Sequence, residues 1–394
     1  MPRPVKVLLA GVVVNRVATF ILPFLSVLLQ RDYGLTDAET GVCILAFGLG
    51  TVAAILTGGL LTDRFGRRPV MAASLLGGGA LAAAVPFSGT GPAFLGLLLL
   101  YGFVGELYRP AVHAAIADLL PPERRAHGFG ALRIAINVGW AIGVTLGGWV
   151  ARFGPVAMFV GDGATTLLFG VMVLLWLPET RSPETAVRAA ASADGPLALA
   201  RTWFADRVLL AVLGASLAFS AWMVSWMTVF PILVDEGTGG SLEVYGLVQG
   251  LNGLLVALLQ IPVVEAVRGR RLRIAAWGMA AGGASVALLG AAPWPFAWAL
   301  LMGAYTLGEM LLMPQLMAFV ADWAPPERRG AYVGSSQSVF SLAFAFGPIL
   351  LLPLRRALGD GAYWPLLALT AVPGILILLW LDRTADRRER LRGA

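Results

Sequence analysis

Two charged residues interrupt a long apolar stretch in the segment GELYRP, at Glu106 and Arg109. They lie three residues apart, so a helix places both on one face, and His113 falls on the same face one turn later. Pro110 cannot donate a hydrogen bond to the carbonyl of Glu106, and that free acceptor must face protein or water. The spacing therefore predicts a polar helical face directed into the protein, where it could bind a solute or a proton.

Four other ionisable residues fall inside apolar stretches, namely Arg16, Arg133, Asp162 and Glu309. A charge in hydrocarbon is costly unless it faces a partner or a water-filled cavity, so each indicates a functional site. The candidates for carrying a coupled proton are the three acids, Glu106, Asp162 and Glu309. The three arginines within apolar stretches all lie in the first half of the chain, so Glu309 has no intramembrane base in its own half. Burial favours the neutral form of a carboxyl group.

Structural interpretations of these residues stay open. Glu106 and Arg109 could form an ion pair that serves only stability, and His113 could be a packed ring. Glu309 could be a neutral acid held by hydrogen bonds. The first half holds all three bases that fall within spans but only two such acids. The one positive charge in excess could attract an anionic solute. The candidates for lining a substrate cavity are Asn15, Arg16, Arg109, His113, Arg133, Asn137, Trp140, Trp222, Trp226, Asn252, Gln315 and Phe340.

The composition places these residues in a membrane protein. Of 394 residues, 58% are hydrophobic and only 13% are charged, whereas soluble domains carry about 25% charged residues. Although the net charge is +6, the distribution of the arginines predicts lipid rather than nucleic acid as the partner. The single cysteine, Cys43, excludes an intrachain disulfide and a multi-cysteine metal site. We expect the first apolar segment to be a retained helix and not a signal peptide.

Apolar runs of about 20 residues, each long enough to cross the hydrocarbon core, recur along the chain. We expect twelve transmembrane helices, at about residues 7–30, 41–62, 69–88, 92–120, 127–151, 154–177, 207–234, 243–265, 272–291, 295–323, 329–353 and 362–381. The fold predicted is an all-α integral membrane protein made of two pseudo-symmetric six-helix bundles. The domains are then 1–178, a cytoplasmic linker at 179–206, and 207–394 with a basic cytoplasmic tail.

The distribution of lysine and arginine predicts the orientation. Three of the 29 basic residues lie within spans, and only Arg31, Arg152, Arg355 and Arg356 fall in loops on one side. All others fall on the opposite side together with both termini, so we expect both termini in the cytoplasm. Arginine-rich loops and this topology favour a bacterial inner membrane as the location.

The two halves of the chain repeat each other at an offset of 204 residues. Pro110 corresponds to Pro314, Asp118 to Asp322, and the segment PPERR at 121 recurs at 325. Parallel repeats of six helices are an architecture of secondary transporters. The repeat therefore favours two related bundles in one chain.

The segment GGLLTDRFGRRP, which follows the second span, resembles the loop signature of the major facilitator superfamily. The matching residues are Gly59, Asp63, Arg64, Gly66, Arg67 and Arg68, and a degenerate copy, EAVRGRR, stands in the second half. The resemblance implies that this loop, with Asp118 as a carboxylate partner, latches a cytoplasmic gate. The alternative is a basic loop that sets only the topology.

The fifth span carries Gly139, Gly143 and Gly147 in the segment NVGWAIGVTLGG. It resembles the glycine-rich signature of the drug:proton antiporters of the superfamily, except that Val144 replaces a proline. A Gly-Pro pair does stand at the repeat-equivalent place, Gly347-Pro348. Close helix packing through small residues is the alternative reading.

The resemblance implies a secondary transporter that works by alternating access, and we expect proton-coupled efflux of amphipathic or drug-like molecules. The alternatives are transport of an organic anion or small metabolite and, outside this class, a non-transporting receptor. No nucleotide-binding loop, nucleophile cluster or metal cluster stands in the sequence. We therefore expect no enzyme and no cofactor. The expected partners are a small-molecule substrate, protons and the bilayer, with the chain acting as a monomer.

Overall fold

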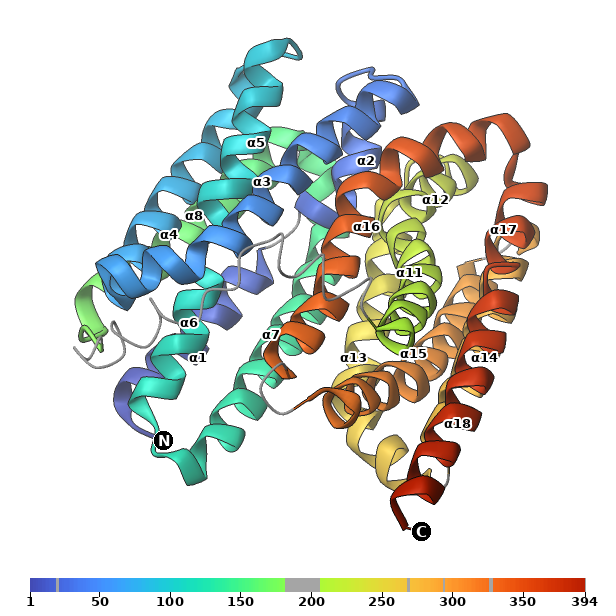
Figure 1. Cartoon of the computed structure of the whole chain (residues 1–394). Coiled ribbons are helices and arrows are strands. Elements are labelled where there is room, and N and C mark those ends of the chain that lie inside the picture. Colours follow the sequence, from blue (N-terminus) through green and yellow to red (C-terminus); the bar gives the residue numbers. More distant parts are fainter. Residues whose placement is uncertain (19–20, 181–205, 268–269, 293–294, 326–328, 394) are drawn as a thin grey trace. The chain divides into compact units, whose positions relative to one another are not determined.

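The protein is built from helices, and no strand occurs among the residues that the structure describes (Figure 1). The computed structural model describes residues 1–394 except for 19–20, 181–205, 268–269, 293–294, 326–328 and 394. The first half contains α1 (Arg3–Val17), α2 (Ile21–Arg31), α3 (Asp37–Phe65), α4 (Arg67–Ala84), η1 (Val85–Phe87), α5 (Pro92–Glu106), α6 (Tyr108–Leu119), α7 (Pro122–Val150), η2 (Ala151–Phe153) and α8 (Gly154–Trp176). The predicted linker at 179–206 falls almost entirely outside the described residues.

The second half repeats this pattern of long apolar helices. It contains α11 (Arg207–Thr228), α12 (Phe230–Thr238), α13 (Leu242–Ala266), α14 (Arg271–Leu288), η3 (Leu289–Ala291), α15 (Pro295–Trp323), α16 (Arg329–Leu358), α17 (Asp360–Ala368) and α18 (Ala371–Gly393). Within the described part of the chain, 11 helical stretches are long and apolar enough to cross a membrane. One of them, Glu123–Trp176, is 54 residues long and holds both α7 and α8. The count is consistent with the twelve helices predicted, and the all-α fold is confirmed.

Contacts divide the chain into two compact units. Unit 1 combines Met1–Ala193, Met227–Leu254 and Pro348–Leu352, and unit 2 combines Asp194–Trp226, Leu255–Gly347 and Pro353–Ala394. The predicted domain boundaries at 178 and 207 stay a prediction.

In unit 1, α4 packs along α8, α3 along α5, and α1 along α7 (Figure 1). Glycine permits the closest of these approaches. A Cβ on Gly50 would lie 2.1 Å from the carbonyl oxygen of Leu99, and one on Gly102 would lie 2.2 Å from that of Phe47. Backbones this close gain dispersion contacts that lipid tails cannot supply, which is how membrane helices associate.

Unit 2 packs α14 against α15 and α18, and an aromatic cluster fills its interior. Phe219 stacks on Tyr305 with ring centroids 5.8 Å apart, and Trp226 lies 5.4 Å from the same tyrosine. A carboxylate, Asp206, joins three segments at one end of the unit. It accepts hydrogen bonds from Trp323 Nε1 at 3.0 Å and from the Tyr332 hydroxyl at 2.8 Å.

Asp206 also caps α11, since its Oδ1 accepts the backbone N–H of residue 208 at 2.8 Å. Burial raises the pKa of the Asp206 carboxyl, but the hydrogen bonds from Tyr332, Trp323 and the helix backbone together lower it below its usual value. The ionised carboxylate therefore holds the start of α11 against α15 and α16 at ordinary pH.

Candidate functional site

The helix that carries GELYRP is broken between Glu106 and Tyr108, where α5 ends and α6 begins. The hydroxyl of Ser74, on α4, fills the break: it donates to the carbonyl of Val104 at 2.6 Å and accepts from the N–H of Tyr108 at 2.9 Å. These two backbone groups would bond to each other in an uninterrupted helix. A side chain inserted into the hydrogen-bond ladder is a recognised cause of helix bending. Pro110, two residues after Tyr108, removes a further donor.

Glu106 and Arg109 form an ion pair at this break. Arg109 Nη2 donates to Glu106 Oε1 at 3.0 Å, and Arg109 Nε also contacts the second carboxylate oxygen. The pairing at i and i+3 agrees with the one-face geometry predicted from their spacing. The side chains neutralise each other, which lowers the cost of placing both in an apolar helix.

Beside this ion pair, unit 1 contains a small polar pocket. Its volume is about 30 Å³, and its lining residues are Asn15, Arg16, Phe47, Tyr101, Gly105, Glu106, Tyr108, Asp162 and Thr166. A cavity of this size with several polar partners is large enough to hold a water molecule. The pocket therefore joins α1, α5, α6 and α8 around polar groups.

Asp162 is the most buried acid of the pocket, with 3% of its surface exposed. The Tyr101 hydroxyl donates a hydrogen bond to Asp162 Oδ2. A second chain of bonds lines the opposite wall: the Tyr108 hydroxyl donates to Asn15 Oδ1 at 2.9 Å, and Asn15 Nδ2 donates to Thr166 Oγ1 at 2.8 Å. Asp162 is thus the buried carboxyl group of the pocket, and the hydroxyl and amide groups beside it are joined by hydrogen bonds.

The charges around the pocket balance. Arg16 and Arg109 supply two positive charges, and Glu106 and Asp162 supply two negative ones. Arg16 Nε is buried and has no hydrogen-bond partner among the described residues. Arg133, the third base expected here, is exposed on α7 and does not line the pocket. The excess positive charge inferred from counting the first half is therefore not found in this pocket.

The other predicted cavity residues of unit 1 lie outside this pocket. His113 is exposed, with its Nδ1 3.0 Å from the carbonyl of Arg109 and its ring stacked on Phe129. Asn137 and Trp140 are half-buried on α7, and Asn252 is half-buried on α13. Their proposed roles in substrate binding stay predictions.

In unit 2 the predicted residues belong to the packed interior. Trp222 is fully buried and donates from Nε1 to Thr370 Oγ1 at 2.9 Å. Phe340 packs edge-on against Phe219, and Gln315 is buried on α15. Glu309 is half-buried and does have an interaction partner. Glu309 is therefore not an isolated carboxylate, and its role as a proton carrier stays a prediction.

The predicted gate loop is organised around Arg67, of which 2% is exposed. Its Nη1 lies 3.2 Å from Asp63, its Nε donates to Asp118 at 2.9 Å, and Nη1 also donates to the carbonyl of Thr62. One guanidinium thus joins the end of α3 to the end of α6. This geometry uses the planar fork of donors that lysine lacks.

Gly66 makes the turn that precedes Arg67. Its φ is +100°, a region that favours glycine, and a Cβ there would lie 2.6 Å from the carboxylate of Glu179. That carboxylate accepts the backbone N–H groups of Arg67 and Arg68 at 3.0 and 3.1 Å. A carboxylate at a helix N-terminus satisfies otherwise unpaired donors and complements the helix dipole.

The remaining loop residues are less constrained. Arg64 lies over the ring of Phe65, and Arg68 donates to the carbonyl of Leu174 at 2.6 Å. Nothing lies within 4 Å of a Cβ built on Gly59. These positions fit a solvated basic loop at least as well as a latch.

Unit 2 carries the same kind of ion pair at the repeat offset. Arg271 Nη1 lies 2.5 Å from Asp322, and both residues stand 204 positions after Arg67 and Asp118. Unlike its counterpart, the second pair is open to solvent, with 55% and 68% of the two side chains exposed. The repeat therefore preserves the contact but not its burial.

The glycines of the fifth predicted span lie against α1. A Cβ on Gly139 would lie 2.5 Å from the Cβ of Arg16, and one on Gly143 would lie 2.4 Å from the Arg16 carbonyl oxygen. Close packing thus accounts for both glycines. It also fixes the position of Arg16 beside the polar pocket.

Sequence reasoning missed Ser74, Tyr101, Tyr108, Thr166 and Glu179. Two of them carried a signal: Tyr101 corresponds to Tyr305 and Thr166 to Thr370, both at the 204-residue offset. A polar residue repeated within an apolar span is informative in the same way as the repeated acid and proline. The other three have no identical residue at that offset, where Gly278, Leu312 and Arg383 stand.

Comparison with known proteins gives consistent results. The Major Facilitator Superfamily sequence model matches residues 7–263 and 218–394. The Na(+), Li(+), K(+)/H(+) antiporter of Planococcus maritimus is 24% identical over 98% of this chain and 97% of its own. The quinolone resistance protein NorA of Staphylococcus aureus is 28% identical over 42% of each chain. The structure of the human organic anion transporter MFSD10 (TETRAN) has a TM-score of 0.66 at 22% identity, covering 96% of this chain and 100% of its own, and so shares the fold.

Proposed function

The chain belongs to the major facilitator superfamily, and on that premise we propose that it exports amphipathic or drug-like molecules in exchange for protons by alternating access. Membership makes it a membrane transporter and not an enzyme. The observation that carries the proton-coupled part of the proposal is the charge-balanced pocket around Asp162.

The pocket supports proton coupling through its charge. With Asp162 ionised, the two guanidinium and two carboxylate groups sum to zero. A proton on Asp162 leaves one positive charge uncompensated in a region of low dielectric, where it is costly. A conformation that opens the pocket to water relieves this cost. Proton binding can therefore bias a two-state equilibrium, which is what coupling requires.

The named relatives support exchange of a solute for protons. They do not indicate the direction of transport or the identity of the solute. One bears the name of a cation/proton antiporter and matches nearly the whole chain. The other bears the name of a quinolone resistance protein and matches less than half of it. The pocket itself is too small for a drug-like molecule, so we assign it to the proton and leave the solute to a separate cavity.

Exchange of an alkali-metal cation for protons is the second candidate. Oxygen atoms of Asn15, Asp162 and Thr166 line a pocket of about 30 Å³, and hard cations prefer oxygen ligands. The guanidinium of Arg16 in the same pocket opposes a second positive charge there. This repulsion places cation exchange behind efflux of organic molecules.

Flux measurements in proteoliposomes test the proposal. With an imposed pH gradient, a lipophilic cation should be transported and should release protons, whereas sodium and an organic anion should do so more weakly. Asp162→Asn should abolish the proton release and keep solute binding by thermal shift, because the amide cannot ionise but can still accept from Tyr101. Glu265→Gln, an exposed acid at the end of α13, serves as the matched control.

Four outcomes would contradict the proposal. Wild-type coupling in Asp162→Asn would exclude this residue as the proton carrier, and loss of coupling in Glu309→Gln alone would move the role to α15. Sodium flux that exceeds that of every organic solute would favour cation exchange. Binding without flux of any solute would favour a receptor.

A further inference from the structure

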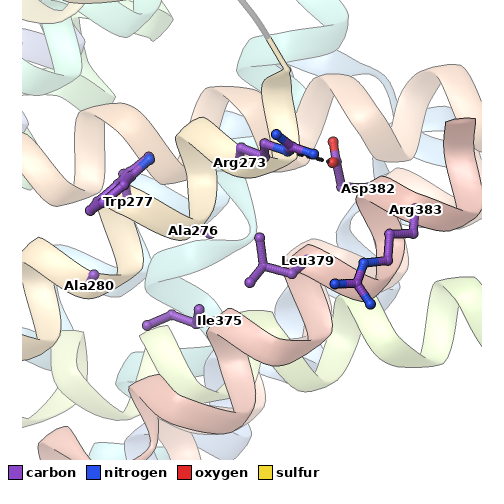
Figure 2. Close-up of a pocket in the computed structure, with 8 residues that line it drawn as sticks. All are labelled: Arg273, Ala276, Trp277, Ala280, Ile375, Leu379, Asp382 and Arg383. Carbon is purple, nitrogen blue, oxygen red and sulfur yellow. Dashed lines mark hydrogen bonds and ion pairs between the residues drawn. The ribbon is translucent and has the colours of Figure 1, made fainter.

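An open groove lies between α14 and α18 in unit 2, apart from the polar pocket (Figure 2). Its volume is about 490 Å³, and it is lined by Arg273, Ala276, Trp277, Ala280, Ile375, Leu379, Asp382 and Arg383. The charged residues come from the start of α14 and the middle of α18. The apolar ones continue along both helices away from that end, so the groove is polar at one end and apolar at the other.

The polar end carries more positive than negative charge. Asp382 is buried and accepts from Arg270 Nη1 and Arg273 Nε, both at 3.0 Å. A single carboxylate therefore orients two guanidinium groups. Arg383 adds a third guanidinium, is exposed, and makes no hydrogen bond or ion pair with the described residues. Three positive groups around one negative group leave room for an anion of one or two charges.

The order of charged and apolar residues along the groove matches the change from headgroups to hydrocarbon in a membrane. Arg273 stands at the start of α14, and Arg383 stands on α18 directly after the apolar part of that helix. The apolar side chains of Leu379 and Ile375 lie one and two turns before Arg383 along α18. Trp277 is 73% exposed beside them, as is typical of the aromatic residues at membrane interfaces. An occupant must therefore be anionic at one end and hydrocarbon at the other.

We propose that this groove binds an anionic phospholipid. The phosphate lies between Arg273 and Arg383, and an acyl chain follows Leu379, Ile375 and Ala280. Guanidinium groups suit phosphate because they donate two parallel hydrogen bonds. Basic pockets between transmembrane helices are a known mode of recognition for anionic lipid headgroups. The arginine distribution places this end of the groove on the predicted cytoplasmic side.

Native mass spectrometry of the full-length protein, released from detergent with added lipid, tests the inference. Wild type should retain phosphatidylglycerol in preference to phosphatidylcholine. Arg383→Gln should weaken that retention about fivefold, since one arginine near an anionic headgroup contributes about 1 kcal/mol. Arg207→Gln, which alters an exposed arginine at the start of α11 on the same predicted side, should leave retention unchanged.

Two further arms separate a lipid from free phosphate. Ala280→Phe fills the apolar end and should reduce phosphatidylglycerol retention while every arginine stays in place. Glycerol phosphate, which has the headgroup but no acyl chain, should not compete. Equal retention of the two lipids, wild-type retention in Arg383→Gln, or full competition by glycerol phosphate would each overturn the inference. An unchanged melting temperature in each variant shows that the groove, and not folding, was altered.

Discussion

A single hydroxyl decides the path of the helix that carries Glu106 and Arg109. Ser74 reaches from α4 into the α5–α6 break and satisfies both the Val104 carbonyl and the Tyr108 N–H. Tyr108 in turn holds Asn15 and so forms one wall of the polar pocket. The position of the charged residues therefore depends on a side chain that is itself uncharged.

Ser74→Ala should both destabilise the protein and impair proton-coupled flux. The substitution leaves a buried N–H and a buried carbonyl without their partner, which costs about 1–3 kcal/mol each unless the helix rearranges. Thr57→Ala is the matched control, because the Thr57 hydroxyl bonds only to the carbonyl of Ala53 in its own helix. Detergent melting temperature and liposome flux measure the two effects. Equal losses in both variants would contradict a special role for Ser74.

At the scale of elements, the crossing of α3 and α5 depends on two glycines. Gly50 faces the main chain at Leu99, and Gly102 faces the main chain at Phe47. The nearest atoms that a Cβ would meet at either position are backbone atoms, which cannot change rotamer as a side chain can. The two helices must therefore separate if either glycine gains a side chain.

Gly102→Ala should lower stability by more than 1 kcal/mol, whereas Gly96→Ala should not. Both residues belong to α5, but nothing lies within 4 Å of a Cβ on Gly96. There the gain in helix propensity, about 0.5–1 kcal/mol, should act alone. Unfolding of the two variants in graded denaturing detergent compares them directly. Tolerance of alanine at Gly102 would show that the two helices can separate without cost.

At the scale of the whole molecule, the two halves repeat an arginine–aspartate contact in different surroundings. Arg67 is almost completely buried, and its partner Asp118 is 21% exposed, whereas Arg271 and Asp322 both face solvent. Buried and exposed ion pairs respond differently to loss of one partner. An unpaired buried charge is costly, while exposed pairs contribute little.

Arg67→Ala should therefore destabilise the protein by about 3 kcal/mol, and Arg271→Ala by less than about 1 kcal/mol. If the first contact also latches a gate, as the resemblance of the loop implies, Arg67→Ala should reduce solute flux at least tenfold. Arg271→Ala, the equivalent substitution in the second half, is the control for Arg67→Ala. Equal effects of the two substitutions would show that burial does not govern their roles, and normal flux in Arg67→Ala would remove the latch.

The sequence alone predicted the features that depend on neighbours along the chain. The length of the apolar runs predicted the spans, and the 204-residue offset predicted that Asp118 and Asp322 occupy equivalent positions in the two halves. The spacing of Glu106 and Arg109 predicted their shared face, because one turn of helix brings them together whatever surrounds it. Pro110 predicted a free carbonyl at Glu106, since the missing donor lies within the same helix.

Only the tertiary structure decided which of the distant residues meet. Arg16 enters the polar pocket and Arg133 does not, although both are arginines within apolar spans. Tyr101 pairs with Asp162, and Glu179 caps α4, over 61 and 112 positions of sequence. The rotation and depth of each helix determine these contacts, and they follow from packing against other helices. A periodic sequence says that a polar face exists, whereas the packed structure decides what that face contacts.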